Sequence, residues 1–274
     1  MLTMLFSIFF ALLSQTCLAS FGTNWGSGPV VPYKTRPDGT MVPDPAAATN
    51  NKIIFAQASI VLPETPTGIN GVKGNLPIWL GLGTYHLPYG CLIQGIINHY
   101  PSSYDPKDPC GDLGTGRWCI TAFILSRNPN FWGENKIAKT GQTVTATCKM
   151  SIRRARWQRK DLHQAIQIRG SKIPKTGVST WPLMGWLSRQ SLQAKAGYAN
   201  GFGFANECTT KPCGWLEAHE WFNISLILQD PDPTYDSTHG TRGWNPKGVW
   251  GGIHTKDGGT TWTSDRIHML LTIL

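Results

Sequence analysis

The chain has 274 residues, of which 11% are aromatic and only 15% are charged, and it contains 30 glycines and 19 prolines. This composition favours an all-β protein with many turns over a helical one, and the length is ample for one large core. The formal net charge of +9 would suit an acidic polymer. Much of it, however, lies in the run Arg153–Lys160, which is typical of a solvated loop or a strand edge.

The first residues have the features of a leader. Residues 5–13 are apolar except for Ser7, and Cys17-Leu18-Ala19 provides a small-residue cleavage site. We interpret residues 1–19 as a signal peptide and residues 20–274 as a single β-sandwich domain. The apolar stretch is too short for a membrane span, which takes about 20 residues. We therefore expect a secreted, extracellular protein, a monomer with no nucleic acid and no membrane among its partners.

Strand signals follow one another from residue 52 onward. Ile53–Leu62 ends at Pro63, and later apolar or alternating segments are typical of strands, with a hairpin turn at His254–Gly259. Residues 161–168 fit a strand or a short helix, and residues 170–200 allow no assignment. The predicted fold is an antiparallel two-sheet β-sandwich of the concanavalin-like jelly-roll type. Thr140–Cys148 fits a turn followed by an alternating strand. The further strand candidates are Leu76–Leu82, Cys91–Asn98, Trp118–Ser126, Phe222–Gln229, Thr260–Trp262 and Ile267–Leu274.

Six cysteines remain after the leader, an even number that allows up to three disulfides in an exported chain. Cys208 and Cys213 are close enough in sequence to close a small local loop. The histidines are scattered and no CxxC pair exists, so we expect no metal site and no cofactor. Asn223-Ile224-Ser225 is an acceptor sequence for an N-linked glycan, which predicts a glycoprotein.

Gln94 is the polar residue that stands out, because it lies within the apolar run Leu92–Ile96. Burying an amide without partners costs roughly 1–3 kcal/mol. Such a side chain is therefore either satisfied in a structural network or directed into a cleft where it binds something.

Several enzyme classes lack their motifs here. The chain has no GxSxG elbow, no Walker loop and no HExxH zinc motif. A glycosidase needs two acids that face one bond. Glu217 and Glu220 are three residues apart, which on one strand would direct them to opposite faces. Polysaccharide cleavage is therefore the least favoured activity.

Five segments in order resemble the eqolisin family of secreted glutamic peptidases. They are Asn24-Trp25 with the following Gly-Ser-Gly, Phe55–Pro63, Ile78–Leu82, Leu92-Ile93-Gln94 and Lys139–Ala146. Glu220-Trp221 is similar to the Glu-Trp pair that carries the family's catalytic glutamate. The resemblance implies a two-sheet β-sandwich and a polypeptide substrate.

The resemblance also implies catalytic roles. A carboxylate would activate water as general base, and Gln94 would donate to the oxyanion. Glu220 is the first candidate for that carboxylate and Glu217 the second, while Trp25 and Trp79 would form the walls of the substrate cleft. Such chemistry favours acidic pH. If Trp215 rather than Trp221 is the matching tryptophan, however, the catalytic position falls on Gly214 and the acid is missing.

Two functions therefore stay open at this point. One is a secreted, acid-acting glutamic endopeptidase with a Gln/Glu dyad. The other is a non-catalytic secreted protein of the same fold that binds a protein or an extracellular glycan through its aromatic face.

Overall fold

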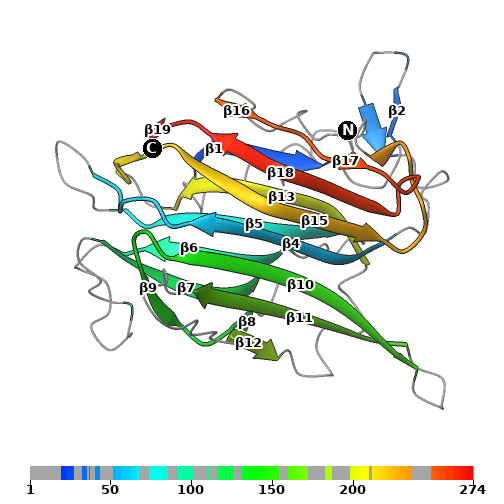
Figure 1. Cartoon of the computed structure of the whole chain (residues 1–274), viewed down its shortest axis with the longest axis horizontal. Helices are drawn as coiled ribbons and strands as arrows, with labels where there is room; N and C mark the ends of the chain where they lie inside the picture. Colours follow the sequence, from blue (N-terminus) through cyan, green and yellow to red (C-terminus); the bar gives the residue numbers. More distant parts are fainter. Residues whose placement is uncertain are drawn as a thin grey trace, which may run out of the picture.

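Two antiparallel β-sheets form the protein (Figure 1). The computed structural model describes residues 20–27, 33–35, 37, 41–43, 52–67, 74–85, 92–100, 110, 116–125, 131–154, 160–171, 183–186, 198–209, 212–235 and 248–273. The predicted leader, residues 1–19, lies outside these ranges. No α-helix occurs within them, and so none that could span a membrane. The prediction of an antiparallel β-sandwich is confirmed.

The sheet that carries Gln94 is called sheet I. Its strands follow the order β1-β13-β5-β6-β7-β8, and β9 also pairs with β7. All of these pairings are antiparallel. The strands are β1 (Ser20–Ser27), β13 (Tyr198–Cys208), β5 (Leu76–Tyr85), β6 (Leu92–His99), β7 (Arg117–Leu125), β8 (Phe131–Trp132) and β9 (Lys136–Lys139).

The second layer, sheet II, crosses the front of Figure 1. Its order is β12-β11-β10-β4-β15-β18-β16, and β17 also pairs with β18. These strands are β12 (Leu183–Trp186), β11 (Lys160–Ser171), β10 (Thr143–Arg154), β4 (Ile53–Val61), β15 (His219–Leu228), β18 (Thr261–Met269), β16 (Val249–Trp250) and β17 (His254–Thr255). Two short pairs complete the fold: β14 (Trp215–Leu216) with β19 (Thr272–Ile273), and β2 (Tyr33–Thr35) with β3 (Met41–Pro43).

Three segments differ from the sequence-based expectations. Residues 161–168 belong to strand β11, so the helical alternative is wrong. Residues 261–269 form one continuous strand, where two separate strands were expected. Residues 170–200, which allowed no assignment, hold β12 and the start of β13.

Alternate residues of each strand fill the space between the sheets, as period-2 geometry requires. Leu80 of sheet I and Ile60 of sheet II are both fully buried there. The rings of Phe204 and Trp221 stack with centroids 4.7 Å apart and join the two layers. This packing fixes which side chains of each strand must face away from the core.

Two disulfides join described cysteines, Cys110–Cys119 and Cys208–Cys213. The second confirms the predicted local loop. Cys148 is a buried free thiol, and burial raises its pKa to about 12. The three bridges that an even count allows are therefore not all formed.

Candidate binding site

Gln94 lies on the outer face of sheet I. Its neighbours Ile93 and Ile97 on β6 belong to the core between the sheets. Because side chains alternate along a strand, Gln94 points the other way. In the register of the sheet it stands opposite Gly81 of β5 and Phe123 of β7.

The side chain of Gln94 is buried, with only 4% of its surface exposed. No hydrogen bond of its amide occurs within the described part of the chain. It is surrounded by the second apolar cluster of the protein, which consists of Trp79, Ile96, Phe123 and Ala205 with Leu92 packed against them. Neither amide atom of Gln94 is among the fully buried polar atoms without a partner. The end of the side chain therefore reaches the surface of this face, where its donor and acceptor can meet water or a ligand.

Two outward-facing glycines lie beside Gln94. Gly83 of β5 pairs with Gly201 of β13, and both face outward. A Cβ atom added to either glycine would meet nothing within 4 Å. Gly83 is a diagonal neighbour of Gln94 across the β5–β6 pair, at about 7–8 Å. The described residues therefore leave these two glycine positions uncovered next to Gln94.

Trp79 and Glu207 share this outer face. The indole Nε1 of Trp79 donates to Oε2 of Glu207 at 3.0 Å. Burial raises the pKa of the Glu207 carboxyl, while the bond from Trp79 opposes that shift. Trp79 is 2% exposed, so Glu207 holds a buried indole in place beside the site.

Trp25 does not belong to this face. Its ring stacks on Phe204 at 5.5 Å and meets Phe202 edge-on at 6.1 Å, within the core between the sheets. The structure therefore places Trp79 near Gln94 but assigns Trp25 to packing.

Glu220 and Glu217 lie on the other side of the molecule. Trp221 of β15 points into the core, so Glu220 faces outward from sheet II. One carboxylate oxygen of Glu220 accepts from Arg266, and the other lies 2.8 Å from Nδ1 of His268. Glu217 precedes β15 and is exposed. A hollow of about 390 Å³ includes both glutamates in its wall, together with Val61, Leu62, Pro63, Ala218, His219, Phe222 and Arg266.

The predicted Gln/Glu pair is consequently not brought together. Gln94 and Glu220 project from opposite outer faces of two stacked sheets, which lie about 10 Å apart before their side chains diverge. Among the described residues, Glu207 is an acid that lies on the same face as Gln94. It lies two strands and four residues away in the register, about 16 Å between Cα atoms. A base and an oxyanion donor must both reach one water by hydrogen bonds, so neither arrangement forms a dyad.

Metal-ligating side chains do not cluster in the residues described by the structure. No group of three or more His, Cys, Asp or Glu residues there could hold a metal ion.

The signals that the sequence analysis missed are the glycine alternations. Gly81-Leu82-Gly83 and Gly201-Phe202-Gly203 place every glycine on one face of adjacent strands. Glycine inside a strand often marks the close approach of another chain or ligand. The pair Phe123 and Trp132, on the same face, was missed as well.

Comparisons with known proteins give a structural likeness only. No protein-family model and no curated protein matches the chain. Among solved structures, two scytalido-glutamic peptidase structures with transition-state analogues match at 12% and 11% identity and TM-scores of 0.44 and 0.45. SCP-B, a member of the eqolisin family of peptidases in complex with the tripeptide Ala-Ile-His, matches at 9% identity and a TM-score of 0.41. Each match covers 92% of this chain and 100% of the other.

These neighbours are glutamic peptidases, the class that the sequence motifs resemble. At such identities and TM-scores, the likeness carries no argument about activity or site residues.

Proposed function

We propose that this chain is a secreted, non-catalytic binding protein that takes an extended polypeptide on the outer face of sheet I. The observation that carries the proposal is the separation of Gln94 from Glu220 and Glu217 on opposite outer faces of the sandwich. Among the described residues no acid lies beside Gln94, so its amide can bind a polar group but has no neighbouring base to direct water against that group.

The surroundings of Gln94 favour a peptide over a sugar as the bound group. A glutamine side chain offers both a donor and an acceptor, which match the acceptor and donor of one peptide unit. A sugar ring presents several hydroxyl groups, and each would need its own partner among Trp79, Leu92 and Phe123. Among the described residues, nothing lies within 4 Å of a Cβ atom added at Gly83 or Gly201, which leaves these two positions free for contact with an extended chain.

We predict that Gln94→Ala weakens binding of a fluorescein-labelled decapeptide of alternating alanine and serine about tenfold. One hydrogen bond contributes about 0.5–1.5 kcal/mol, and 1.4 kcal/mol is a factor of ten. Fluorescence anisotropy with the mature chain measures the affinity. Gln57→Ala is the matched control, because Gln57 is a strand glutamine on the outer face of sheet II, bonded to Thr147. Equal affinities of wild type and both variants would refute the proposed site.

The second candidate is the acid-acting glutamic endopeptidase. It is favoured by the buried, unpartnered Gln94 and by Glu207, an acid on the same face whose pKa is raised by burial. The test is incubation of the mature chain with a denatured protein between about pH 2 and 6, the range where carboxylates titrate. We expect no new N-termini. Cleavage that is lost in Gln94→Ala and in one of Glu207→Gln, Glu217→Gln or Glu220→Gln would establish the peptidase instead.

A further inference from the structure

We infer that Trp132 is the specificity-determining residue of this face and holds an aromatic side chain of the bound polypeptide. The inference rests on the proposed binding function and names the chemistry of one part of its ligand.

Trp132 stands in the same cross-strand row as Gln94. In the register, Gln94 pairs with Phe123, and Phe123 pairs with Trp132 on the edge strand β8. The rings of Phe123 and Trp132 lie with centroids 4.0 Å apart. Phe123 is buried, with 7% of its surface exposed, whereas Trp132 is 60% exposed. One face of the Trp132 indole therefore packs against Phe123, and the other face is exposed and can contact a ligand.

The backbone around Trp132 is built to hold it there. Gly133 donates from its N–H to the carbonyl oxygen of Ala122 at 2.7 Å, and its own carbonyl accepts from the Thr121 hydroxyl at 3.3 Å. A Cβ atom at Gly133 would come within 3.2 Å of both Cβ and O of Ala122. The glycine thus allows β8 to approach β7 closely enough for the two rings to meet.

A fixed, exposed indole loses little conformational entropy when it binds, because its orientation is already set. Aromatic pairs contribute about 0.5–1.5 kcal/mol beyond the area they bury. No charged side chain takes part in the row Gly81, Gln94, Phe123 and Trp132. A neutral aromatic side chain is the group that this row fits best.

The spacing sets where in the ligand that side chain lies. Gln94 and Trp132 are two strand spacings apart, about 10 Å, and an extended chain advances about 3.3 Å per residue. The aromatic residue should therefore lie about three residues from the peptide unit that Gln94 binds.

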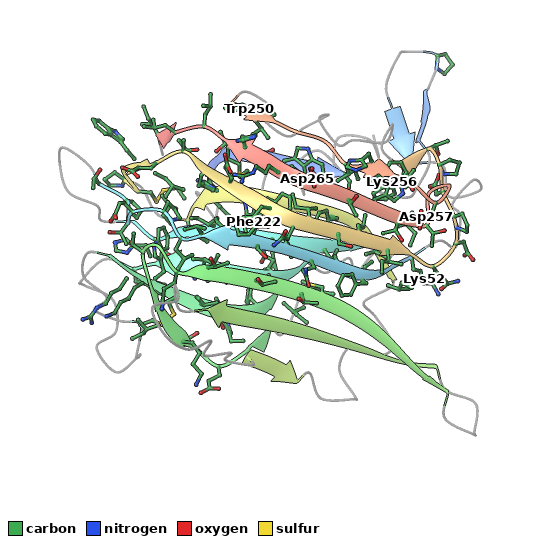
Figure 2. All side chains as sticks on the ribbon, in the orientation of Figure 1. Lys52, Phe222, Trp250, Lys256, Asp257 and Asp265 are labelled. Atoms are coloured by element: carbon green, nitrogen blue, oxygen red, sulfur yellow. A yellow bond between two sulfur atoms is a disulfide. The ribbon has the colours of Figure 1, made fainter. Side chains whose placement is uncertain are left out.

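The experiment compares the labelled alanine-serine decapeptide with the same peptide carrying one central phenylalanine. We expect wild type to bind the phenylalanine peptide about tenfold more tightly. Trp132→Ala should remove this preference, so that the two peptides bind it with equal affinity, while Trp132→Phe should retain part of the preference. Trp250→Ala is the matched control, since Trp250 is an exposed tryptophan stacked on His268 of sheet II. Figure 2 shows Trp250 at the edge of that sheet.

The outcomes separate this inference from the proposed function. If wild type binds neither peptide, the proposed function itself fails. If it binds both equally, or if the preference survives in Trp132→Ala, only the inference about Trp132 is overturned. Binding of a cello-oligosaccharide that depends on Trp132, without peptide binding, would overturn both in favour of a glycan.

Discussion

Gly259→Ala should lower the free energy of unfolding by about 2–5 kcal/mol. Gly259 has a φ of +100°, and an added Cβ would lie 2.3 Å from the carbonyl carbon of Asp232 and 2.5 Å from Pro233 N. These are backbone atoms that cannot rotate away. The expected loss combines about 1–2 kcal/mol for the left-handed backbone with about 1–3 kcal/mol for overpacking. Thermal unfolding should show a melting temperature lower by roughly 10 °C, at about 2–4 °C per kcal/mol.

Gly258→Ala is the control for this prediction. Gly258 also has a positive φ, +73°, but an added Cβ would meet nothing within 4 Å. It should cost only the backbone term, about 1–2 kcal/mol. Similar melting temperatures for the two variants would contradict the view that the β17–β18 turn is pressed against residues 232–233. Figure 2 shows the neighbouring Asp257 and Lys256 in this turn, at the end of the sheet.

Acidification should destabilise the protein by about 3 kcal/mol between pH 6.5 and 4 through His219. Nδ1 of His219 donates to the carbonyl oxygen of Glu217 at 3.0 Å, and among the described residues nothing pairs with the buried Nε2. Burial lowers the pKa to about 4 from 6.5. Between pH 6.5 and 4, His219 binds a proton in the unfolded chain but not in the folded protein. Stability therefore falls as the pH falls, and the loss levels off below pH 4.

The measurement is chemical denaturation at several pH values for wild type and His219→Asn. Asparagine can keep the bond to the Glu217 carbonyl without titrating. The variant should lose this part of the pH dependence, while His254→Asn, at an exposed histidine, should behave as wild type. His99, whose pKa is also lowered by burial, adds to the loss in every variant. The raised pKa of the Glu207 carboxyl acts in the opposite direction, and it does so in wild type and variants alike. Protonation of that carboxyl in the folded protein relieves a buried charge, so it favours the folded state as the pH falls. A parallel pH dependence in wild type and His219→Asn would contradict the role of His219.

This dependence bears on the peptidase assay. A protein that loses stability through buried His219 is weakest in the acidic range where glutamic chemistry would operate. Each cleavage measurement at low pH therefore needs a circular-dichroism control that the chain is still folded.

Much of the fold could be predicted from the sequence because period-2 patterns decide it locally. The predicted strand Ile53–Leu62 corresponds to β4, and the turn His254–Gly259 does join two paired strands. The helical alternative at residues 161–168 arose because that segment lacks clear alternation. Its strand state follows from pairing with β10 and β12, a tertiary cause that no local pattern carries.

The site was predictable only in part. The unusual position of Gln94 was visible in the sequence, because an amide within apolar residues is a local feature. The sheet to which a strand belongs is not a local feature, because it depends on pairing with strands that are distant in the sequence. Glu220 and Gln94 both lie on outward positions of their strands, but the strands belong to different layers. Trp25 was expected in a cleft, yet it packs in the core, since its outward or inward direction depends on the register of β1 with β13.

The β-bulge at Asn223 has a consequence for the biology of the surface. Asn223 is exposed, has a φ of +51° and lies where the pairing of β15 with β4 shifts register. It heads the acceptor sequence Asn223-Ile224-Ser225. An oligosaccharide attached there would cover sheet II and leave the face of Gln94 and Trp132 bare. The outer face of sheet II would then be shielded and the outer face of sheet I would stay exposed. Enzymatic removal of the oligosaccharide would therefore change proteolysis and recognition at sheet II only.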